Sequence, residues 1–381
     1  MNRPLRIGFD VAQTCQERAG CGWYADSLAH ALAAADSGDE FILYHHFGRW
    51  FNESTARGTR IEAPHVRSPL QDLGAAEAAD LWREIAAGTR PLPGAPDIVH
   101  ANSYQAPAVG GAKLVFTVYD VCYWTHPEFT TDGNRLHCQE GVFEALARAD
   151  GFLFISESSH REFDRILPGW LERSGKPWAV TLLGQREAPP APVAAPAAPP
   201  AADYWLAVGT LEPRKNYETL LDALDLYWAR SPQPRPLRIA GGGGWKSEAL
   251  KTHLTALEER GRVQRLGYVP DEELGRLYAG TQALIFPSWH EGFGLPVLEA
   301  MSQGAPVISS DRASLPEVGG EAVVYVDPAS AESVCQAMLA LEADPARRAG
   351  LVEAGRAQAA RFSWARTARE TLDFYRRVCG Q

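Results

Sequence analysis

Two glutamates frame the stretch of this chain whose residue types could do chemistry. Glu291 and Glu299 lie eight residues apart within residues 286–304, with Gly292 and Gly294 between them. A carboxylate accepts two hydroxyl hydrogen bonds at once, which suits a ribose or a hexose diol. Glycines let backbone N–H groups approach a phosphate, and a helix start adds donors and partial positive charge. The pattern indicates anion binding with sugar recognition; two solvated glutamates are the structural alternative.

The elements around this stretch predict how the two carboxylates are positioned. An apolar strand-like run over 283–286 ends in a turn at Pro287 and Ser288, and a helix with apolar spacing follows from Leu295. One glutamate is then expected in the loop before the helix and the other about one turn inside it. A ligand lying on the helix N-terminus could contact both.

A second candidate group is the pair Arg214 and Lys215 in the string GTLEPRKN. It follows a predicted strand over 204–208 and precedes a predicted helix over 217–229. Two cations at a strand end can neutralise a diphosphate of about −2 and stabilise the charge that grows on it as a glycosidic bond breaks. A solvated turn is the alternative.

Strands alternate with helices through both halves of the chain, which predicts two parallel-sheet, Rossmann-like α/β domains. The first half carries apolar runs over 5–11, 41–44, 98–101, 113–118 and 151–155, with helical patterns over 23–35, 140–148 and 157–167. The second half carries strands over 204–208, 237–240, 263–269, 283–286, 306–309 and 322–326, with helices over 217–229, 271–279, 330–343, 345–360 and 364–378.

The 381 residues suffice for two domains, because a single core rarely grows beyond about 250–300 residues. An Ala/Pro-rich tract over 187–203 cannot form a core and is expected to be an extended linker. The predicted organisation is an N-terminal domain over 1–186, the linker, a C-terminal domain over 204–361 and a closing helix over 362–381. Facing domains of this kind leave a cleft at the carboxyl ends of their strands, where ligands bind.

Composition excludes several classes of function. The formal net charge of −10 argues against a nucleic-acid partner and against docking of the whole surface on anionic lipid. No apolar run is long enough to span a membrane, and the N-terminus lacks a signal-peptide core, so a cytoplasmic protein is expected. The six scattered cysteines favour free thiols. No D-x-D motif occurs, which favours metal-independent chemistry and no cofactor.

The string E-G-F-G-L-P-V-L-E resembles the E-x7-E signature of the retaining family 4 glycosyltransferases of the GT-B fold, which are group 1 glycosyltransferases. The G-x4-R-K-N string resembles the diphosphate-binding pair of that family. The resemblance implies that Glu291 binds donor-sugar hydroxyls, Glu299 holds the ribose diol, and Arg214 with Lys215 holds the diphosphate. It also implies that the last helix crosses back onto the first domain.

The resemblance places further donor contacts in glycine turns and at the helix start. The turn G-C-G-W-Y after the first strand resembles the family's phosphate-contacting G-x-G-x-Y, and the G-G-G-G and L-G-Y-V turns resemble loops that cradle the nucleobase. Simple tight turns are the alternative for these glycines. The predicted donor-binding residues besides Glu299 are Gly20, Gly22, Gly209, Gly241, Gly242, Tyr268, Gly292, Phe293, Gly294 and Leu295.

The first half supplies the predicted acceptor side. T-V-Y-D resembles a family stretch that usually reads T-x-H-D, so that Tyr119 replaces a histidine that lies near the transferred sugar. Asp120 is a candidate to bind an acceptor hydroxyl or act as base, or it caps a turn. His100 and Tyr24 are expected to line the cleft, with a structural histidine as the alternative for His100. His290 is expected to face the donor, with the same structural alternative.

These resemblances imply a retaining hexosyltransferase that takes a sugar from a nucleoside diphosphate. Mannose or a deoxyhexose on GDP is favoured over a UDP-sugar, and the acceptor is expected to be a glycan or lipid-linked glycan in cell-surface polysaccharide biosynthesis such as O-antigen. Peripheral association with the inner face of the cytoplasmic membrane stays open, as does the oligomeric state. The rival functions are an epimerase or hydrolase of the same fold and a non-catalytic nucleotide-sugar-binding subunit. A dehydrogenase is disfavoured because neither half opens with G-x-G-x-x-G.

Overall fold

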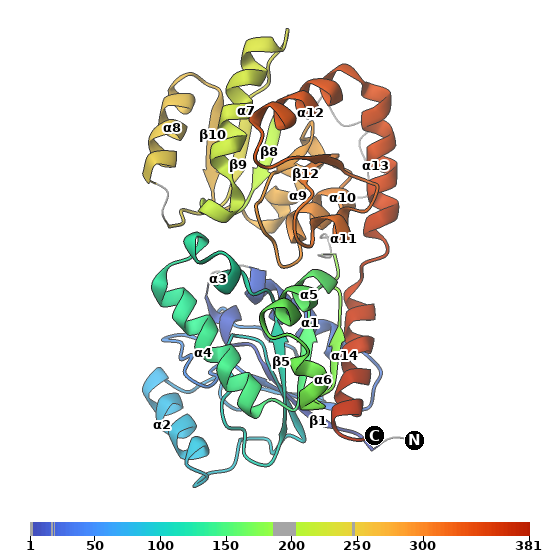
Figure 1. Cartoon of the computed structure of the whole chain (residues 1–381). Coiled ribbons are helices and arrows are strands. Elements are labelled where there is room, and N and C mark those ends of the chain that lie inside the picture. Colours follow the sequence, from blue (N-terminus) through green and yellow to red (C-terminus); the bar gives the residue numbers. More distant parts are fainter. Residues whose placement is uncertain (1–2, 17, 19, 186–202, 246–247) are drawn as a thin grey trace. The chain divides into compact units, whose positions relative to one another are not determined.

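The computed structural model describes residues 3–16, 18, 20–185, 203–245 and 248–381 (Figure 1). They form two compact units. The first combines the residues up to Pro127 with Asp132–Gly184 and Ser363–Gln381, and the second combines Glu128–Thr131 with the residues from Gln185 to Phe362. Of the expected linker over 187–203, only Asp203 lies within the described residues.

The first unit is built on a seven-stranded sheet in the order β3-β2-β1-β4-β5-β6-β7. All its strand pairs are parallel. Every residue of β4 and β6 is buried, because helices cover both faces of the sheet. Such strands are mostly apolar and do not alternate between apolar and polar residues. Its strands are β1 (Arg6–Asp10), β2 (Glu40–Tyr44), β3 (Val66–Arg67), β4 (Ile98–Ala101), β5 (Lys113–Val118), β6 (Gly151–Phe154) and β7 (Trp178–Val180).

The second unit repeats this topology with six parallel strands in the order β10-β9-β8-β11-β12-β13. In both sheets the first strand of the unit lies between the second and the fourth, so that the strand order reverses beside it. Its strands are β8 (Trp205–Val208), β9 (Leu237–Ala240), β10 (Val263–Gly267), β11 (Leu284–Phe286), β12 (Val307–Ser310) and β13 (Val324–Val326). The predicted two-domain, doubly wound α/β class is confirmed.

Helices connect the strands in both units (Figure 1). In the first unit they are η1 (Ala12–Cys15), α1 (Gly20–Ala34), α2 (Ala75–Ala86), α3 (Cys122–Thr125), α4 (Asp132–Arg148), α5 (Glu157–Ile166) and α6 (Trp170–Ser174), with η2 (Pro127–Phe129) at the unit boundary. In the second they are η3 (Pro213–Lys215), α7 (Tyr217–Arg230), α8 (Glu248–Glu259), α9 (Asp271–Gly280), α10 (Leu295–Ser302), α11 (Leu315–Gly319), α12 (Ala331–Ala343) and α13 (Pro345–Ala359).

Two predicted helix starts are wrong. Helix α4 begins at Asp132, two turns before residue 140, because an exposed polar turn precedes its buried face. Helix α1 begins at Gly20, so Gly20 and Gly22 lie in its first turn rather than in a loop before it. Gly22 packs closely against the backbone of the preceding segment, since a Cβ added to Gly22 would lie 3.2 Å from the Gln13 carbonyl oxygen. Ala19 of the same motif lies outside the described residues.

The C-terminal helix α14 (Trp364–Val378) packs on α1 of the first unit, as predicted (Figure 1). Ser363 caps it by accepting a hydrogen bond from the Arg366 N–H. Along its length the Thr367 hydroxyl donates to the Leu182 carbonyl at 2.5 Å, and Arg376 pairs with the buried Asp39 at 2.9 Å. The last helix therefore belongs to the first unit although it follows the second in sequence.

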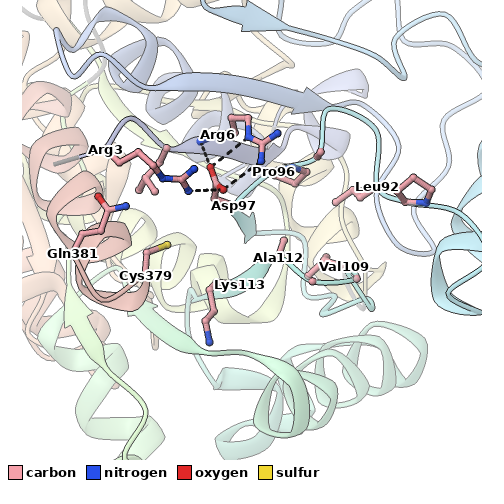
Figure 2. Close-up of a pocket in the computed structure, with 15 residues that line it drawn as sticks. Arg3, Arg6, Leu92, Pro96, Asp97, Val109, Ala112, Lys113, Cys379 and Gln381 are labelled. Carbon is pink, nitrogen blue, oxygen red and sulfur yellow. Dashed lines mark hydrogen bonds and ion pairs between the residues drawn. The ribbon is translucent and has the colours of Figure 1, made fainter.

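A pocket of about 500 Å³ lies at the amino ends of the first sheet's strands (Figure 2). There the Asp97 carboxylate accepts hydrogen bonds from the Arg3 guanidinium and the Arg6 N–H, each at 2.8 Å, and Lys113 pairs with Asp150 at 2.9 Å. These cations already have carboxylate partners. Ligands of parallel sheets bind at the opposite, carboxyl edge.

Two expectations from composition can be compared with the structure. All six cysteines are free, four of them buried, as predicted. Among the described residues, no helix combines the length and the apolar character that a bilayer span requires.

Two glycines of α4 generate a stability prediction. A Cβ on Gly141 would lie 1.9 Å from the Tyr104 carbonyl oxygen, whereas a Cβ on Gly133 meets nothing within 4 Å. Gly141→Ala should therefore lower the free energy of unfolding by about 1–3 kcal/mol or more, since rigid backbone must move. The matched variant Gly133→Ala should cause no loss. Urea denaturation of both variants tests this, and equal stabilities would contradict the packing of α4 on residue 104.

Candidate functional site

The candidate site lies where the second sheet reverses its strand order. Strands β8 and β11 are neighbours there, and the loops that follow both leave the carboxyl edge of the sheet. The loop after β8 carries Arg214 and Lys215 in the 3₁₀ turn η3, and the loop after β11 carries Glu291. Side chains 76 residues apart in sequence thus lie together at the carboxyl edge of the sheet.

Close backbone contacts shape the loop after β8. Gly209 has φ +142° and Gly241 has φ +158°, and a Cβ on Gly241 would lie 2.0 Å from the Gly209 carbonyl oxygen. The Tyr217 hydroxyl donates to the same carbonyl at 2.7 Å. Gly241 therefore has a structural reason to be glycine in the close approach of the two loops, and Gly209 has one in its positive φ.

Asn216 fixes the junction between η3 and α7. It adopts a left-handed conformation with φ +57° and is buried. Its side-chain N–H groups donate to the carbonyls of Pro287 and Pro328 at 2.9 and 2.8 Å. Asn216 thereby ties the loop after β8 to the loop after β11 and positions the two cations that precede it.

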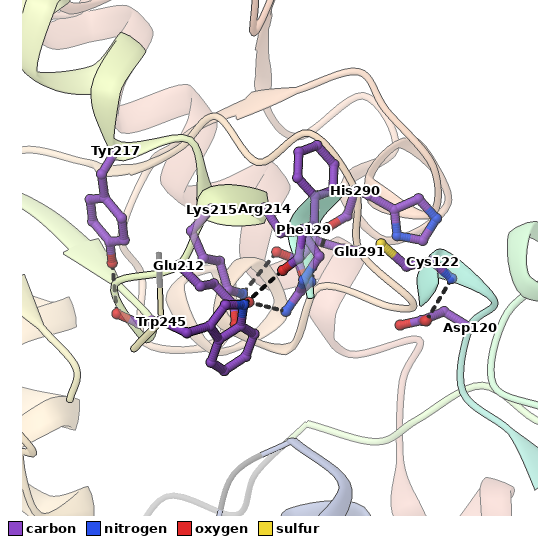
Figure 3. A network of polar contacts seen from close by, with 11 residues as sticks. Asp120, Cys122, Phe129, Glu212, Arg214, Lys215, Tyr217, Trp245, His290 and Glu291 are labelled. Atoms are coloured by element: carbon purple, nitrogen blue, oxygen red, sulfur yellow. Dashed lines mark hydrogen bonds and ion pairs between the residues drawn. The ribbon is translucent and has the colours of Figure 1, made fainter. Parts of the chain in front are cut away.

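Four charged side chains form ion pairs with one another at this edge of the sheet (Figure 3). The Glu291 carboxylate accepts from Arg214 at 2.5 Å through one oxygen and from Lys215 at 2.8 Å through the other. Arg214 also donates to the Glu212 carboxylate at 2.6 Å and to the His290 carbonyl at 2.9 Å. We call Glu212, Arg214, Lys215 and Glu291 the ionic cluster.

The ionic cluster is nearly closed to solvent. Side-chain exposure is 4% for Glu212, 8% for Glu291, 11% for Lys215 and 23% for Arg214. Burial alone would raise the pKa of Glu291, but the positive charges of Arg214 and Lys215 outweigh it and lower this pKa to about 2. Glu291 is therefore a carboxylate at neutral pH, and the four formal charges of the cluster balance.

The backbone around Glu291 is held by three hydrogen bonds. The Ser314 hydroxyl donates to the Glu291 carbonyl at 2.7 Å, and the Trp289 N–H donates to the Arg214 carbonyl at 2.9 Å. The Ser310 hydroxyl donates to the Ser288 carbonyl at 2.6 Å. These bonds hold the loop against the loop after β8, the end of β12 and the segment that follows β12.

Helix α10 begins directly after this loop. Its N-cap Gly294 has φ +106°, and a Cβ there would lie 2.8 Å from the Leu315 side chain, so only glycine fits without strain. Phe293 is buried edge-on against Phe362, with ring centroids 5.9 Å apart. Gly292 precedes these residues, and Leu295 opens the helix, as predicted.

Glu299 lies in α10 about one turn from its start. It is 7% exposed and accepts a hydrogen bond from the buried Tyr278 hydroxyl at 3.0 Å. The structure thus brings Glu291, Arg214 and Lys215 together and gives Glu299 a partner of its own.

The predicted nucleobase loops lie at the ends of β9 and β10. The Gly241 N–H donates to the Gly267 carbonyl at 2.8 Å, which joins the two loops. Gly242 has open space where a side chain would begin. Tyr268 is 57% exposed, one of three large hydrophobic residues that stand out from the described surface.

In the first unit, Tyr119 and Asp120 follow β5. The Tyr119 hydroxyl donates to the Asn102 carbonyl at 2.7 Å, and its ring packs edge-on against Tyr24. Asp120 is half-buried and accepts from the Cys122 N–H at 3.0 Å, which is the turn-capping bond that the sequence allowed as an alternative. One carboxylate oxygen of Asp120 is therefore used within its own loop.

The expectation that His100 and Tyr24 line the cleft is wrong, and the structural alternative for His100 is the one observed. Both side chains are fully buried in the first unit. The ring nitrogens of His100 contact the Tyr375 and Thr117 hydroxyls, each at 2.6 Å, and the Tyr24 hydroxyl lies 3.2 Å from that of Thr117. Burial lowers the pKa of His100 to about 3, so it is a neutral core histidine. Tyr119, only 5% exposed, is also a core residue.

Sequence reasoning missed several residues that support the site. Glu212 lies within GTLEPRKN, where the sequence predicts no role for it, although its carboxylate accepts a hydrogen bond that orients Arg214. Asn216, Tyr278 and Ser314 hold the loops and Glu299. A carboxylate two residues before a predicted phosphate-binding arginine is a signal that could have identified Glu212; the other three carry no local signal.

Asp10 is a further buried carboxylate, at the strand-order reversal of the first sheet. It is the last residue of β1 and accepts hydrogen bonds from the Ser103 hydroxyl at 2.5 Å, the Ala12 N–H at 3.0 Å and the Asn102 N–H at 3.3 Å. Burial raises its pKa to about 6 even though these bonds act in the opposite direction. It ties the loop after β4 to the end of β1.

No cluster of three or more His, Cys, Asp or Glu side chains arranged to hold a metal ion occurs within residues 3–16, 18, 20–185, 203–245 and 248–381.

The low pKa of Glu291 predicts a pH dependence of stability. A carboxyl group whose pKa is lower in the folded state stabilises the fold above its unfolded-state pKa, and this contribution is lost as the pH falls through the folded-state pKa. The difference in unfolding free energy between the wild type and Glu291→Gln should therefore shrink by about 3 kcal/mol as the pH falls from about 5 to about 2. Urea denaturation over this range measures it, and a constant difference would contradict the ion pairing.

Comparisons with known proteins identify the family of this chain. The family model of "Glycosyl transferases group 1" matches residues 194–358. The chain is 33% identical over 267 residues to O-antigen chain mannosyltransferase B of Escherichia coli, which covers 69% of this chain and 70% of that protein. It is 29% identical over 350 residues to the serotype-specific mannosyltransferase WbdA of the same species, covering 83% of this chain and 40% of WbdA.

Solved structures share the architecture. Sucrose-phosphate synthase from Thermosynechococcus elongatus matches with a TM-score of 0.71 at 22% identity, covering 99% of both chains. WaaG, a glycosyltransferase involved in lipopolysaccharide biosynthesis, matches with a TM-score of 0.69 at 15% identity, covering 97% of this chain and 99% of that one. At these identities the structures support the GT-B fold, and the sequence relationship supports the family. The chain belongs to the group 1 glycosyltransferases.

Proposed function

We propose that this glycosyltransferase is a retaining hexosyltransferase that moves mannose or a deoxyhexose from a nucleoside-diphosphate sugar to a glycan or lipid-linked glycan. The ionic cluster carries the proposal, because it places a guanidinium and an ammonium side by side at the carboxyl edge of the sheet. The names of the relatives, O-antigen and serotype-specific mannosyltransferases, support the sugar and the setting in cell-surface polysaccharide synthesis.

Arg214 and Lys215 are the proposed diphosphate ligands. The charge on the diphosphate grows as the bond to the anomeric carbon breaks, and preorganised cations stabilise that charge most where water is excluded. Because these two cations would supply the neutralising charge, the proposed reaction needs no metal ion. The same arrangement predicts that EDTA leaves transfer unchanged.

The two carboxylates divide the remaining recognition. Glu299 is proposed to hold the ribose diol and Glu291 the hydroxyls of the transferred sugar, as the family signature implies. Gly242 and Tyr268 lie on joined loops at the same sheet edge and are proposed to contact the nucleobase, with the exposed Tyr268 ring available for stacking. Gly20, Gly22 and Asp120 stay proposals for the phosphate and acceptor contacts of the first unit.

Retention is proposed to follow from attack on the same face that the leaving group departs from. In that reaction the departing phosphate oxygen takes the proton of the acceptor hydroxyl, so that the enzyme supplies no covalent nucleophile. GDP-sugars are proposed as donors ahead of UDP-sugars. Solved neighbours in this fold include HepE of Anabaena in complex with UDP and glucose, so the nucleobase needs a direct test.

Nucleotide binding is the first test of the donor. GDP should raise the melting temperature of the wild type more than UDP does at equal concentration, because a GDP-sugar is the proposed donor. A ligand at 100 times its dissociation constant stabilises the fold by about 2.7 kcal/mol. Lys215→Ala should abolish most of either shift. A larger shift with UDP would reject the donor preference while leaving the diphosphate assignment standing.

Transfer kinetics test the catalytic assignment. Lys215→Ala should lower kcat/KM by roughly 10²–10³ with a GDP-sugar and a glycan acceptor, with or without EDTA. Arg230→Ala is the matched control, since it removes one cation at the far end of α7, where Arg230 pairs with Glu332. NMR of the product should show the anomeric configuration of the donor. Wild-type activity in Lys215→Ala, or an inverted product, would contradict the proposal.

A further inference from the structure

The Glu291 carboxylate occupies the hydrogen-bonding positions that a diphosphate would need. One oxygen accepts from the Arg214 Nη1 group and the other from Lys215 Nζ. Nη1 carries two hydrogens, and both are used, because the second is directed to the His290 carbonyl at 2.9 Å. The carboxylate therefore bridges the two cations as two phosphate oxygens would.

Charge reinforces this competition. In the ionic cluster two cations balance two carboxylates, and a diphosphate would add a charge of about −2. If Glu291 kept its position, three anionic groups would face Arg214 and Lys215 in a largely desolvated site, and like charges repel strongly under such conditions. Removing Glu291 from the cations relieves that repulsion. Glu212 contacts the other guanidinium nitrogen, Nη2, and can remain in place.

The polypeptide around Glu291 permits a side-chain movement without a loop movement. Its carbonyl is fixed by the Ser314 hydroxyl, and the preceding Trp289 N–H is fixed by the Arg214 carbonyl. A change of side-chain rotamer redirects the carboxylate while these backbone bonds persist.

We propose that Glu291 is an internal counterion of the diphosphate site that a bound diphosphate displaces, and that it thereby distinguishes the sugar donor from the spent nucleoside diphosphate. This inference rests on the proposed function. A donor that carries its sugar displaces the carboxylate and then offers it hydroxyl groups. A nucleoside diphosphate without the sugar displaces it and offers nothing in exchange, so the product binds less tightly and leaves more readily.

Titration with inorganic pyrophosphate tests the competition without involving the nucleobase. Glu291→Gln keeps the shape of the side chain and removes its charge, so it should bind pyrophosphate about tenfold more tightly than the wild type, or more. Glu291→Asp keeps the charge, but its shorter side chain cannot reach both cations, so it should bind pyrophosphate several-fold more tightly than the wild type. This variant replaces Glu291→Gln in the test if the latter does not fold. Calorimetry measures the dissociation constants, and thermal denaturation checks folding.

Glu342→Gln is the matched control within the second unit. Glu342 is a largely buried carboxylate that pairs with Arg235 and accepts from the Tyr227 and Ser231 hydroxyls at 2.8 and 2.7 Å. Its variant should bind pyrophosphate as the wild type does. An equal gain in this control would show a general charge effect and overturn the inference.

The outcomes separate this inference from the function beneath it. If Lys215→Ala weakens pyrophosphate binding while the Glu291 variants bind no more tightly than the wild type, the counterion role is wrong and the diphosphate site stands. If Lys215→Ala binds pyrophosphate as the wild type does, the diphosphate site itself is wrong, and the counterion role falls with it. If the Glu291 variants bind pyrophosphate more tightly than the wild type and Glu342→Gln does not, the result supports the inference.

Discussion

The ion pairs that Glu291 makes with Arg214 and Lys215 are the constraint on which the second unit's site depends. They join the loops after β8 and β11, two strands that are adjacent because the strand order reverses between them. Buried charges are stable only when paired, so these loops must keep their mutual position. Asn216 and Ser314 add neutral hydrogen bonds that support the same geometry. The proposed recognition of a diphosphate and the stability of these loops therefore rest on the same side chains.

The two units use one topology for different purposes. Each places a carboxylate at its strand-order reversal. In the first unit Asp10 is surrounded by hydroxyl and amide donors, and burial raises its pKa. In the second unit Glu291 is surrounded by two cations, and its pKa is lowered. The shared topology thus fixes where a polar side chain can lie, and the neighbouring residues decide whether that side chain accepts neutral hydrogen bonds or pairs with cations.

Most strands and helices of this fold could be predicted from sequence, because apolar runs and helical spacing directly reflect burial. Strands β4, β5 and β9 and helix α14 have the predicted bounds. Short elements such as β3 and α3 carry too few residues to show a period. The direction of a side chain was the less predictable property. In strands buried on both faces no alternation marks a functional face, so the sequence allowed both a cleft-lining and a structural role for His100. The structure shows a core residue held between Thr117 and Tyr375.

The fold class and the family signature can be inferred from the amino-acid sequence. So can the kinds of side chain at the candidate site, which are a basic pair, two acids and the glycines that permit tight turns. These are local properties, and local spacing expresses them. The pairing of Glu291 with Arg214 and Lys215 is visible in the folded protein and not in the sequence. The same holds for the hydrogen bond from Tyr278 to Glu299 and for the contact of Glu212 with Arg214. Such pairings depend on which strands become neighbours and on how far burial strengthens each charge, and both follow from contacts between residues distant in sequence.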